Sequence, residues 1–476
     1  MNRIGRLFLT GVIVLLAVCL AYTPHALMEP SGTDVVFKDK LLEDSLKGIV
    51  KKENGESLTA EDLQKLTVVD LSNKGISDLS GLEHASNLTH LNLSNNKISD
   101  VSPLQQMTSM RGLNLSGNSI ASIQGLAAMK DMVELLVSSN QITSLDVVRN
   151  FPRLHTLSVT DNKISNIDAL SAATNMLFLK INVNAVTNID AIGKLVKIQL
   201  LDLSHNRISQ LAPLRALTGL GHLNIEGNQI RDISPIKNIT NLRSIQAANN
   251  QIKDITPLKK LTKLYSIDLN ENLVYNLEAL SGMTELNYLY LYSNRVWDLS
   301  PIQNLKFDFH FDTGAPRHGL ILNDNYLDDR AGTVTSKIVQ KLNPDYLAPQ
   351  KPTQRLVVGS ATAFVGEKSY RLTNAPFISA SRTYMPIRFI ATQLGAAVSW
   401  NQGKQEVTII KKSKTIKWVV GEKKVAANGK TVAYDAPMRL KKGSTFLPIR
   451  FISEQLDSSV EYESSKKMVI IFDESK

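Results

Sequence analysis

Apolar residues recur along the middle of the chain with a period of 22 residues, from about residue 67 to residue 330. Each period contains a Leu-x-Leu pair such as Leu91-Asn-Leu93, followed by further apolar positions at Ile98, Val101 and Leu104. Alternation with period two predicts a short β-strand whose leucines point inward. Repetition of one unit at this length predicts a solenoid, in which each coil buries its apolar side chains against the next coil.

One asparagine occupies the same place in ten consecutive coils, three residues after the second leucine of the strand. At this corner, backbone groups face the interior without a sheet partner, and an unpaired buried group costs about 1–3 kcal/mol. An asparagine side chain offers donors and an acceptor, so we expect a ladder that joins neighbouring coils. The ladder residues are Asn96, Asn118, Asn140, Asn162, Asn184, Asn206, Asn228, Asn250, Asn272 and Asn294.

The rest of each coil is too short for a full α-helix, so we expect turns or 3₁₀ segments on the convex side. Before the repeats, residues 35–66 have apolar residues at helical spacing, and Thr59 with Asp62 fits an imperfect capping box. The predicted fold is therefore an α/β solenoid with a helical N-terminal cap. A parallel β-sheet lines its concave face.

The pattern changes at both ends of the repeats. Lys74 stands at the ladder position of the first coil, and the last ladder residue, Asn325, comes later after Asn294 than the regular period would place it. The nine extra residues are expected to bulge or pair irregularly before a closing coil, and the solenoid is expected to end near residue 330. Residues 331–356 lose the periodicity and contain several prolines, so we interpret them as a linker with one short helical turn at 337–342.

The stretch 357–474 contains an internal duplication. The segment from Thr383 to Leu394 matches the segment from Thr445 to Leu456, and both contain Pro-Ile-Arg-Phe-Ile. Strand-like runs flank each copy, and Asn428-Gly429 is typical of a tight hairpin turn. We predict a C-terminal α+β domain built from two tandem half-repeats.

The net charge of +10 resides in the last quarter of the chain, because residues 352–476 hold 20 Lys/Arg and 10 Asp/Glu whereas residues 1–351 hold 34 of each. A basic domain suggests an anionic surface or polymer as partner, and a solvated strand face is the alternative. The candidate basic patch consists of Lys411, Lys412, Lys414, Lys417, Lys423, Lys424, Lys441 and Lys442.

The first 26 residues have the pattern of an export signal: two arginines followed by the apolar run 7–22. Cleavage after Ala21 or Ala26, lipidation at Cys19 and retention as an uncleaved anchor remain open, and a membrane contact is expected only if the segment stays. Cys19 is the only cysteine, so cleavage would leave no thiol for a disulfide or a metal site. No Leu-Pro-x-Thr-Gly motif occurs, so covalent attachment to a cell wall is not expected.

The outward positions of the predicted strands are mostly small and polar, but one coil differs. Tyr288, Tyr290 and Tyr292 all point outward, and Arg295 follows them. Tyrosine and arginine are enriched in binding hot spots, so we predict a ligand site here, with Phe178 and Lys180 as a lesser outward pair. The alternative is that the tyrosines stack on a neighbouring strand or domain as ordinary strand residues.

The repeats resemble the leucine-rich repeats of bacterial internalin-like surface proteins, which have the same period. The final domain resembles the N-terminal domain of copper amine oxidases, in the form found in secreted proteins of Gram-positive bacteria. Type-2 copper requires imidazole ligands, and all eight histidines lie at or before His318. The stretch Asn287-Tyr288-Leu-Tyr290 has leucine where the oxidase motif has an acidic residue. We therefore expect no catalytic residue, no metal and no cofactor.

Together these patterns predict a non-catalytic, exported protein at the cell surface or cell wall. Its concave face would bind a protein or glycan ligand, and its basic domain would associate with an anionic cell-wall polymer. An adhesin for host surfaces, or an accessory or receptor subunit of an envelope enzyme or signalling system, is the alternative. Nucleic acid would suit the basic charge equally well, but export argues against it as a partner.

Overall fold

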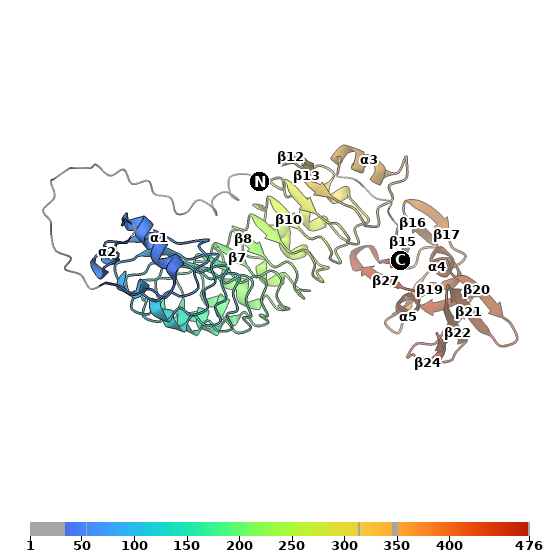
Figure 1. Cartoon of the computed structure of the whole chain (residues 1–476). Coiled ribbons are helices and arrows are strands. Elements are labelled where there is room, and N and C mark those ends of the chain that lie inside the picture. The colour runs from blue at the N-terminus through green and yellow to red at the C-terminus, as the bar shows by residue number, and fades with distance from the viewer. Residues whose placement is uncertain (1–33, 54, 313–314, 345–349, 351, 475–476) are drawn as a thin grey trace.

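A computed structural model describes residues 34–53, 55–312, 315–344, 350 and 352–474. A long curved solenoid leads into a smaller C-terminal domain at its far end (Figure 1). The predicted export signal, residues 1–26 with Cys19, lies outside the described residues. Within those residues, no helix is long and apolar enough to cross a membrane.

Two helices cap the first coil, as predicted. Helix α1 spans Lys40–Val50 and helix α2 spans Ala60–Gln64, where Thr59 and Asp62 form the capping box. The carboxylate of Asp39 caps α1 through the N–H groups of residues 41 and 42, and its other oxygen accepts hydrogen bonds from the N–H and hydroxyl of Ser77 in the first coil. One side chain thus holds the cap against the repeats.

The solenoid contains one parallel sheet of twelve strands, ordered along the chain and all in register. The inward side chains of the strands, which are apolar and mostly leucine, are buried in one continuous core. The strands are β1 (Val68–Asp70), β2 (His90–Asn92), β3 (Gly112–Asn114), β4 (Glu134–Leu136), β5 (Thr156–Ser158), β6 (Phe178–Lys180), β7 (Leu200–Asp202), β8 (His222–Asn224), β9 (Ser244–Gln246), β10 (Ser266–Asp268), β11 (Tyr288–Tyr290) and β14 (Leu320–Ile321).

Short 3₁₀ helices form the opposite side of the coils, as the sequence predicts. In five of them a proline is the second residue, where its missing N–H costs no hydrogen bond. They are Leu82–His84, Ser102–Leu104, Gln124–Leu126, Asp146–Asn150, Asp168–Ala172, Asp190–Lys194, Ala212–Ala216, Ser234–Ile236, Thr256–Lys260, Glu278–Leu280 and Ser300–Ile302.

The asparagine ladder has the hydrogen bonds that its spacing predicts. In a typical rung, the Asn206 amide donates to the carbonyls of Ile181, Leu203 and Ser204, and its oxygen accepts from the Val186 N–H at 2.9 Å. Each rung therefore binds its own coil and the preceding one. Asn325 repeats the pattern in the closing coil.

The residue before each ladder asparagine has a left-handed backbone, which the sequence analysis did not foresee. Its φ lies between about +51° and +70° in every coil from the first to the last, including a β-branched residue, Val183 at +56°. This conformation is costly for such a residue. The parallel hydrogen bond from its N–H to the next coil, 3.0 Å to the Ser204 carbonyl, holds it there.

The nine extra residues near the C-terminal end of the solenoid belong to a hairpin rather than an irregular bulge. Strands β12 (Phe309–Asp312) and β13 (Ala315–His318) pair antiparallel. The chain then turns back at Gly319, where a side chain would collide with the Asn287 carbonyl. Glycine is therefore required at the point where β14 joins the parallel sheet.

The interpretation of residues 331–356 as a linker with one short helical turn is wrong in two places. Helix α3 (Val334–Leu342) packs Ile338 onto the end of the solenoid core. Strand β15 (Gln354–Val357) is an integral strand of the C-terminal domain, between β16 and β28. The sequence predicted only one turn of α3, at 337–342, and did not reveal β15, because prolines break the pattern next to both elements.

The C-terminal domain has three antiparallel sheets and two helices, α4 (Ile387–Gln393) and α5 (Ile449–Gln455). Sheet orders are β17-β16-β15-β28-β27, β18-β19-β26-β25 and β20-β21-β22-β23-β24. Its remaining strands are β16 (Thr362–Val365), β17 (Lys368–Arg371), β18 (Phe377–Ser379), β19 (Arg382–Pro386), β20 (Ala397–Asn401), β21 (Glu406–Lys411), β22 (Lys414–Val419), β23 (Lys424–Ala427), β24 (Lys430–Ala433), β25 (Arg439–Lys441), β26 (Ser444–Pro448), β27 (Ser458–Glu463) and β28 (Met468–Asp473).

The duplication in this domain is more complete than the sequence analysis predicted. Every element from β15 to β21 has a counterpart at the same offset along the chain, so β15, β16 and β17 correspond to β22, β23 and β24. Met385 pairs with its own counterpart, Leu447, at the centre of the middle sheet. The two five-stranded sheets are therefore equivalent, and we call them the docking sheet (β17-β16-β15-β28-β27) and the free sheet (β20-β21-β22-β23-β24).

Candidate ligand-binding site

The three tyrosines of the eleventh coil lie on the outward side of the parallel sheet, with Leu289 and Leu291 buried between them. The Tyr288 ring contacts the Tyr265 ring edge-to-face, with centroids 6.0 Å apart. Tyr288 and Tyr290 are half-buried, whereas Tyr292 is 42% exposed. Burial, together with the nearby Asp308 carboxylate, raises the pKa of Tyr288. We call Tyr265, Tyr288, Tyr290 and Tyr292 the tyrosine patch.

A carboxylate that the sequence analysis missed lies beside the tyrosine patch. Asp268 is paired with Tyr290 in the strand register of β10 and β11. Burial, and then the carboxylates of Glu226 and Glu271, raise the pKa of Asp268, although a hydrogen bond from the Asn270 N–H opposes this. A cationic group from a ligand would relieve the repulsion among these carboxylates. The strand register could have revealed Asp268, since residue 268 precedes Tyr290 by one repeat.

Phe178 and Lys180 lie on β6, five strands from β11. Neighbouring strands are about 4.8 Å apart, so roughly 24 Å separates this pair from the tyrosine patch. The structure therefore does not join the two predicted groups into one site. The leucine of the next coil at the same outward position, Leu200, is the register partner of Phe178.

The prediction that Arg295 belongs to the ligand-binding face is corrected by the structure. Arg295 forms ion pairs with Glu461 and Glu474 of the C-terminal domain, and its guanidinium lies 5.8 Å from the Phe472 ring centroid. The reason is its position: it follows the ladder asparagine, where the coil has already turned away from the sheet. Arg295 is thus a residue of the domain interface.

The docking sheet packs on the flank of the last coils through an apolar stripe on β28. Met468, Ile470 and Phe472 are buried against Tyr275, Trp297 and Tyr326 of the solenoid. The Phe472 ring contacts the Tyr326 ring edge-to-face at 4.9 Å, and the Tyr326 hydroxyl donates to the Asp473 carbonyl. Burial raises the pKa of Tyr326 to about 12. Tyr275 and Trp297 are therefore docking residues.

Polar contacts surround this stripe on two sides. Lys253 pairs with Glu461 on one side. On the other, the Glu367 carboxylate accepts from the N–H groups of Val334 and Thr335 and so caps α3, while its own N–H donates to Asp328. These bonds connect the turn between β16 and β17 to the closing coil. The two domains are thus joined by apolar packing and by hydrogen bonds, not only by the chain.

The free sheet shows why only one of the two equivalent sheets docks. The stripe of Met468, Ile470 and Phe472 on β28 corresponds to Glu406, Thr408 and Ile410 on β21. Ile410 is 46% exposed, whereas Phe472 is fully buried. Polar residues and a smaller apolar side chain thus replace the docking stripe on the free sheet.

The eight candidate lysines do not form one exposed patch. Lys411 is a correction to the prediction: it is buried, donates to the Leu456 carbonyl at 2.8 Å and pairs with Asp473 at 3.2 Å. Side chains along β21 alternate between the two faces of the strand, and Lys411 therefore points inward. Lys414 pairs with Asp457. Four exposed ones lie on the free sheet or in its turns, and two lie at the end of β25 of the middle sheet and in the turn after it: Lys412, Lys417, Lys423 and Lys424, and Lys441 and Lys442.

The described residues contain no group of three or more histidine, cysteine, aspartate or glutamate side chains placed to hold a metal ion. The histidines of the described region are spread over the coils, and His90 and His222 are six strands apart.

Comparison with protein families gives two matches. The model described as leucine-rich repeats (two copies) matches residues 86–128, 131–172, 196–238 and 240–281. The model described as copper amine oxidase N-terminal domain matches residues 364–471. The chain thus combines leucine-rich repeats with a region like the N-terminal domain of copper amine oxidases, as its motifs predict. The comparison with curated proteins gave no match.

Two solved structures illustrate the likeness of the solenoid. The internalin InlF from Listeria monocytogenes is 26% identical, with a TM-score of 0.61, and the alignment covers 66% of this chain and 90% of that one. A leucine-rich repeat protein from Leptospira interrogans, 19% identical with a TM-score of 0.51, covers 62% of this chain and 81% of its own and shows the fold alone. An internalin-like repeat fold indicates a protein-binding or adhesin role.

Proposed function

We propose that this chain is a non-catalytic, exported binding protein whose tyrosine patch takes a protein ligand. The observation that carries the proposal is the cluster of aromatic rings on an outward face that is otherwise mostly small and polar. Tyrosines supply large contact area at low entropic cost and are enriched in binding hot spots. The likeness to an internalin supports a protein as the ligand.

The charges beside the patch define the ligand further. Asp268 with Glu226 and Glu271 makes this part of the sheet acidic, and Tyr292 is exposed at its edge. A basic side chain seated here would pair with Asp268 and lie against a tyrosine ring. The ligand segment is therefore expected to carry a lysine or arginine next to an apolar residue.

A selection from a displayed peptide library tests this proposal. Peptides selected on the full chain should carry a basic residue, and changing Tyr288, Tyr290 and Tyr292 together to serine should abolish their binding. The matched control is Phe178→Ser, which removes an outward aromatic residue five strands away. Binding that survives the triple change, or that is lost equally in the control, refutes the site. Selected peptides without basic residues refute the role of Asp268.

We further propose that the C-terminal domain helps retain the protein at the cell envelope, through the exposed lysines of the free sheet. Lys417 and Lys424 lie on the same outward face, because Lys417 pairs with Ala426, two residues from Lys424. The solenoid covers the apolar stripe on β28 of the docking sheet, whereas Ile410 at the equivalent place on β21 of the free sheet stays exposed. Electrostatic attraction of this kind weakens as salt rises.

Sedimentation with purified cell walls tests this second role. The full chain should sediment with walls at low salt and be released by high salt or by removal of anionic wall polymers. A variant with four lysines of the free sheet and its turns changed to glutamine should sediment less: Lys412, Lys417, Lys423 and Lys424. The control changes four exposed solenoid lysines: Lys97, Lys163, Lys237 and Lys259. Equal loss in both variants, or retention at high salt, contradicts a specific basic face.

A further inference from the structure

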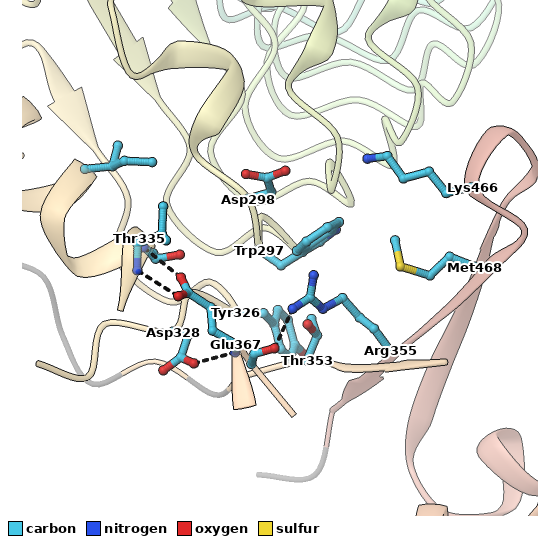
Figure 2. Close-up of a pocket in the computed structure, with 13 residues that line it drawn as sticks. Trp297, Asp298, Tyr326, Asp328, Thr335, Thr353, Arg355, Glu367, Lys466 and Met468 are labelled. Carbon is cyan, nitrogen blue, oxygen red and sulfur yellow. Dashed lines mark hydrogen bonds between the residues drawn. The ribbon is translucent and has the colours of Figure 1, made fainter. Parts of the chain in front are cut away.

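A cavity of about 340 Å³ lies between the two domains, next to the docking stripe. One wall comes from the closing coil, α3 and the coil that carries Trp297 and Asp298. The other comes from β15, β28 and the turn between β16 and β17 (Figure 2). This volume falls within the usual range of small-molecule sites, and such sites often lie between domains.

Arg355 on β15 projects into this cavity (Figure 2). Its guanidinium lies 4.4 Å from the ring centroid of Trp297 and 5.3 Å from that of Phe364. Its Nη2 donates to the Gly366 carbonyl. Its Nε is buried and has no hydrogen-bond partner among the described residues. A buried donor without a partner is unfavourable, and more so when it belongs to a charged group.

The carboxylates near Arg355 are already engaged with other groups. Asp328 forms two hydrogen bonds of 2.6 Å with Arg330. Glu367 caps α3, and an oxygen of Asp298 accepts from the Ser300 N–H at 2.9 Å. Burial lowers the pKa of Arg355, which those three carboxylates only partly oppose. The guanidinium thus lacks a close counter-ion among the described residues, while the cavity in front of it leaves room for one.

The duplication shows that this arginine is specific to the interface. The counterpart of Arg355 in the second half is Lys417, which is exposed on the free sheet, and the counterpart of Gly366 is Asn428. At position 366 a side chain would collide with the Asp328 carboxyl group. Glycine and arginine therefore occur together where the cavity is built, and neither occurs at the equivalent place that faces solvent.

We propose that the cavity between the domains binds a small molecule with one carboxylate, which pairs with Arg355 while its apolar part lies against Trp297 and Met468. Guanidinium groups recognise carboxylates through charge-assisted hydrogen bonds. A dianionic phosphate fits less well, because Asp298, Asp328 and Glu367 surround the guanidinium. Since both domains supply walls, the bound molecule stabilises the docked arrangement.

Phenylacetate and phenylacetamide test the proposal on the full chain, because they share a shape and differ in charge. The protein has three tryptophans, so three indole N–H signals are expected in an amide correlation spectrum. The signals of Trp400 and Trp418, which lie in the C-terminal domain away from the cavity lining, serve as internal references. Phenylacetate should shift the Trp297 signal saturably and raise the melting temperature, whereas phenylacetamide should do neither.

Arg355→Gln should weaken phenylacetate binding about tenfold or more, as loss of a charge-assisted pair implies. Arg371→Gln, an exposed arginine of the same sheet, should leave it unchanged, and Arg355→Lys checks that the loss is not one of folding. Four results would overturn the proposal. Phenylacetamide could bind as well as phenylacetate, or phenylacetate binding could be unaffected by Arg355→Gln. Inorganic phosphate could bind more tightly than phenylacetate, or no probe could shift the Trp297 signal.

Discussion

Removing one rung of the asparagine ladder tests how the solenoid is held together. Asn206→Ala deletes a side chain that is 8% exposed and makes four hydrogen bonds. Three of these go to carbonyls that keep another partner: Ile181 from the Asn184 amide, Leu203 from the Asn228 amide, and Ser204 from the Val183 N–H. The Val186 N–H, by contrast, loses the partner that the structure gives it within the described residues.

The expected loss of folding stability follows from this difference between the carbonyl groups and the N–H group. An orphaned buried N–H costs about 1–3 kcal/mol, and the weakened carbonyls add roughly 1 kcal/mol, so we expect a loss of about 2–4 kcal/mol. Asn206→Asp should cost more near neutral pH, because it places a carboxylate against three carbonyl oxygens and cannot donate. That extra cost should shrink as the pH falls, since a protonated carboxyl group can donate.

Equilibrium urea unfolding followed by circular dichroism measures the loss, and hydrogen exchange with mass spectrometry locates it. Protection should fall first in the coils that share the rung, because a solenoid is stabilised by interactions between neighbouring coils. The control is Asn238→Ala, an exposed asparagine on the convex side. If Asn206→Ala falls within about 0.5 kcal/mol of this control, a typical effect of a surface change, the ladder does not stabilise the solenoid.

Three further predictions follow from other contacts. Phe472→Ala removes the fully buried ring of the docking stripe, which costs about 3–5 kcal/mol of packing free energy. The change should separate the domains, and X-ray scattering should then show a larger maximum dimension. Its counterpart on the free sheet, Ile410→Ala, should leave the scattering unchanged. If both changes alter the scattering equally, docking through this stripe is contradicted. Burial alone would raise the pKa of Asp39, but hydrogen bonds from the first coil lower it below 3.8. The ionised carboxylate therefore stabilises the folded chain fully above pH 3.8, and this stabilisation is lost as the pH falls through the lowered pKa. Asp39→Asn should remove this acid-dependent step from thermal melts, and an unchanged step refutes the assignment. The pKa of Asp268 is raised, so ionisation of this carboxylate lowers the stability of the folded chain at pH values above that pKa. Asp268→Asn keeps the acceptor for the Asn270 N–H and should raise the melting temperature at pH 7. The increase should vanish in acid. A lower melting temperature at pH 7 contradicts this account of Asp268.

The domain interface illustrates what sequence patterns alone do not reveal. Phe472 and Ile410 occupy equivalent strand positions, and both fit a half-buried strand pattern. Only the assembled structure shows that one is covered by Tyr326 and that the other is exposed. Arg295 likewise follows three outward tyrosines in sequence, yet the turn after Asn294 directs it to Glu461. Contacts between such distant parts of the chain leave no local signal.

The repeats themselves were predictable because each coil buries its leucines and pairs its backbone groups in the same way as its neighbours. A fixed period with inward leucines determines the parallel sheet, the register and the outward position of Tyr288, Tyr290 and Tyr292, since strand side chains alternate between faces. The asparagines determine the corner, because a buried backbone group needs a partner. These features depend only on a coil and its neighbour, and the sequence displays both.

The tertiary structure alone decided how the two domains meet and which side chains remain available for ligands. It placed Arg295 in the domain interface, buried Lys411 inside the C-terminal domain, and enclosed Arg355 in a cavity between domains. The physical reason is the range of the interactions. Periodic hydrophobic burial and ladder hydrogen bonds repeat along the chain, whereas docking depends on one stripe of β28 meeting one flank of the solenoid, which happens once.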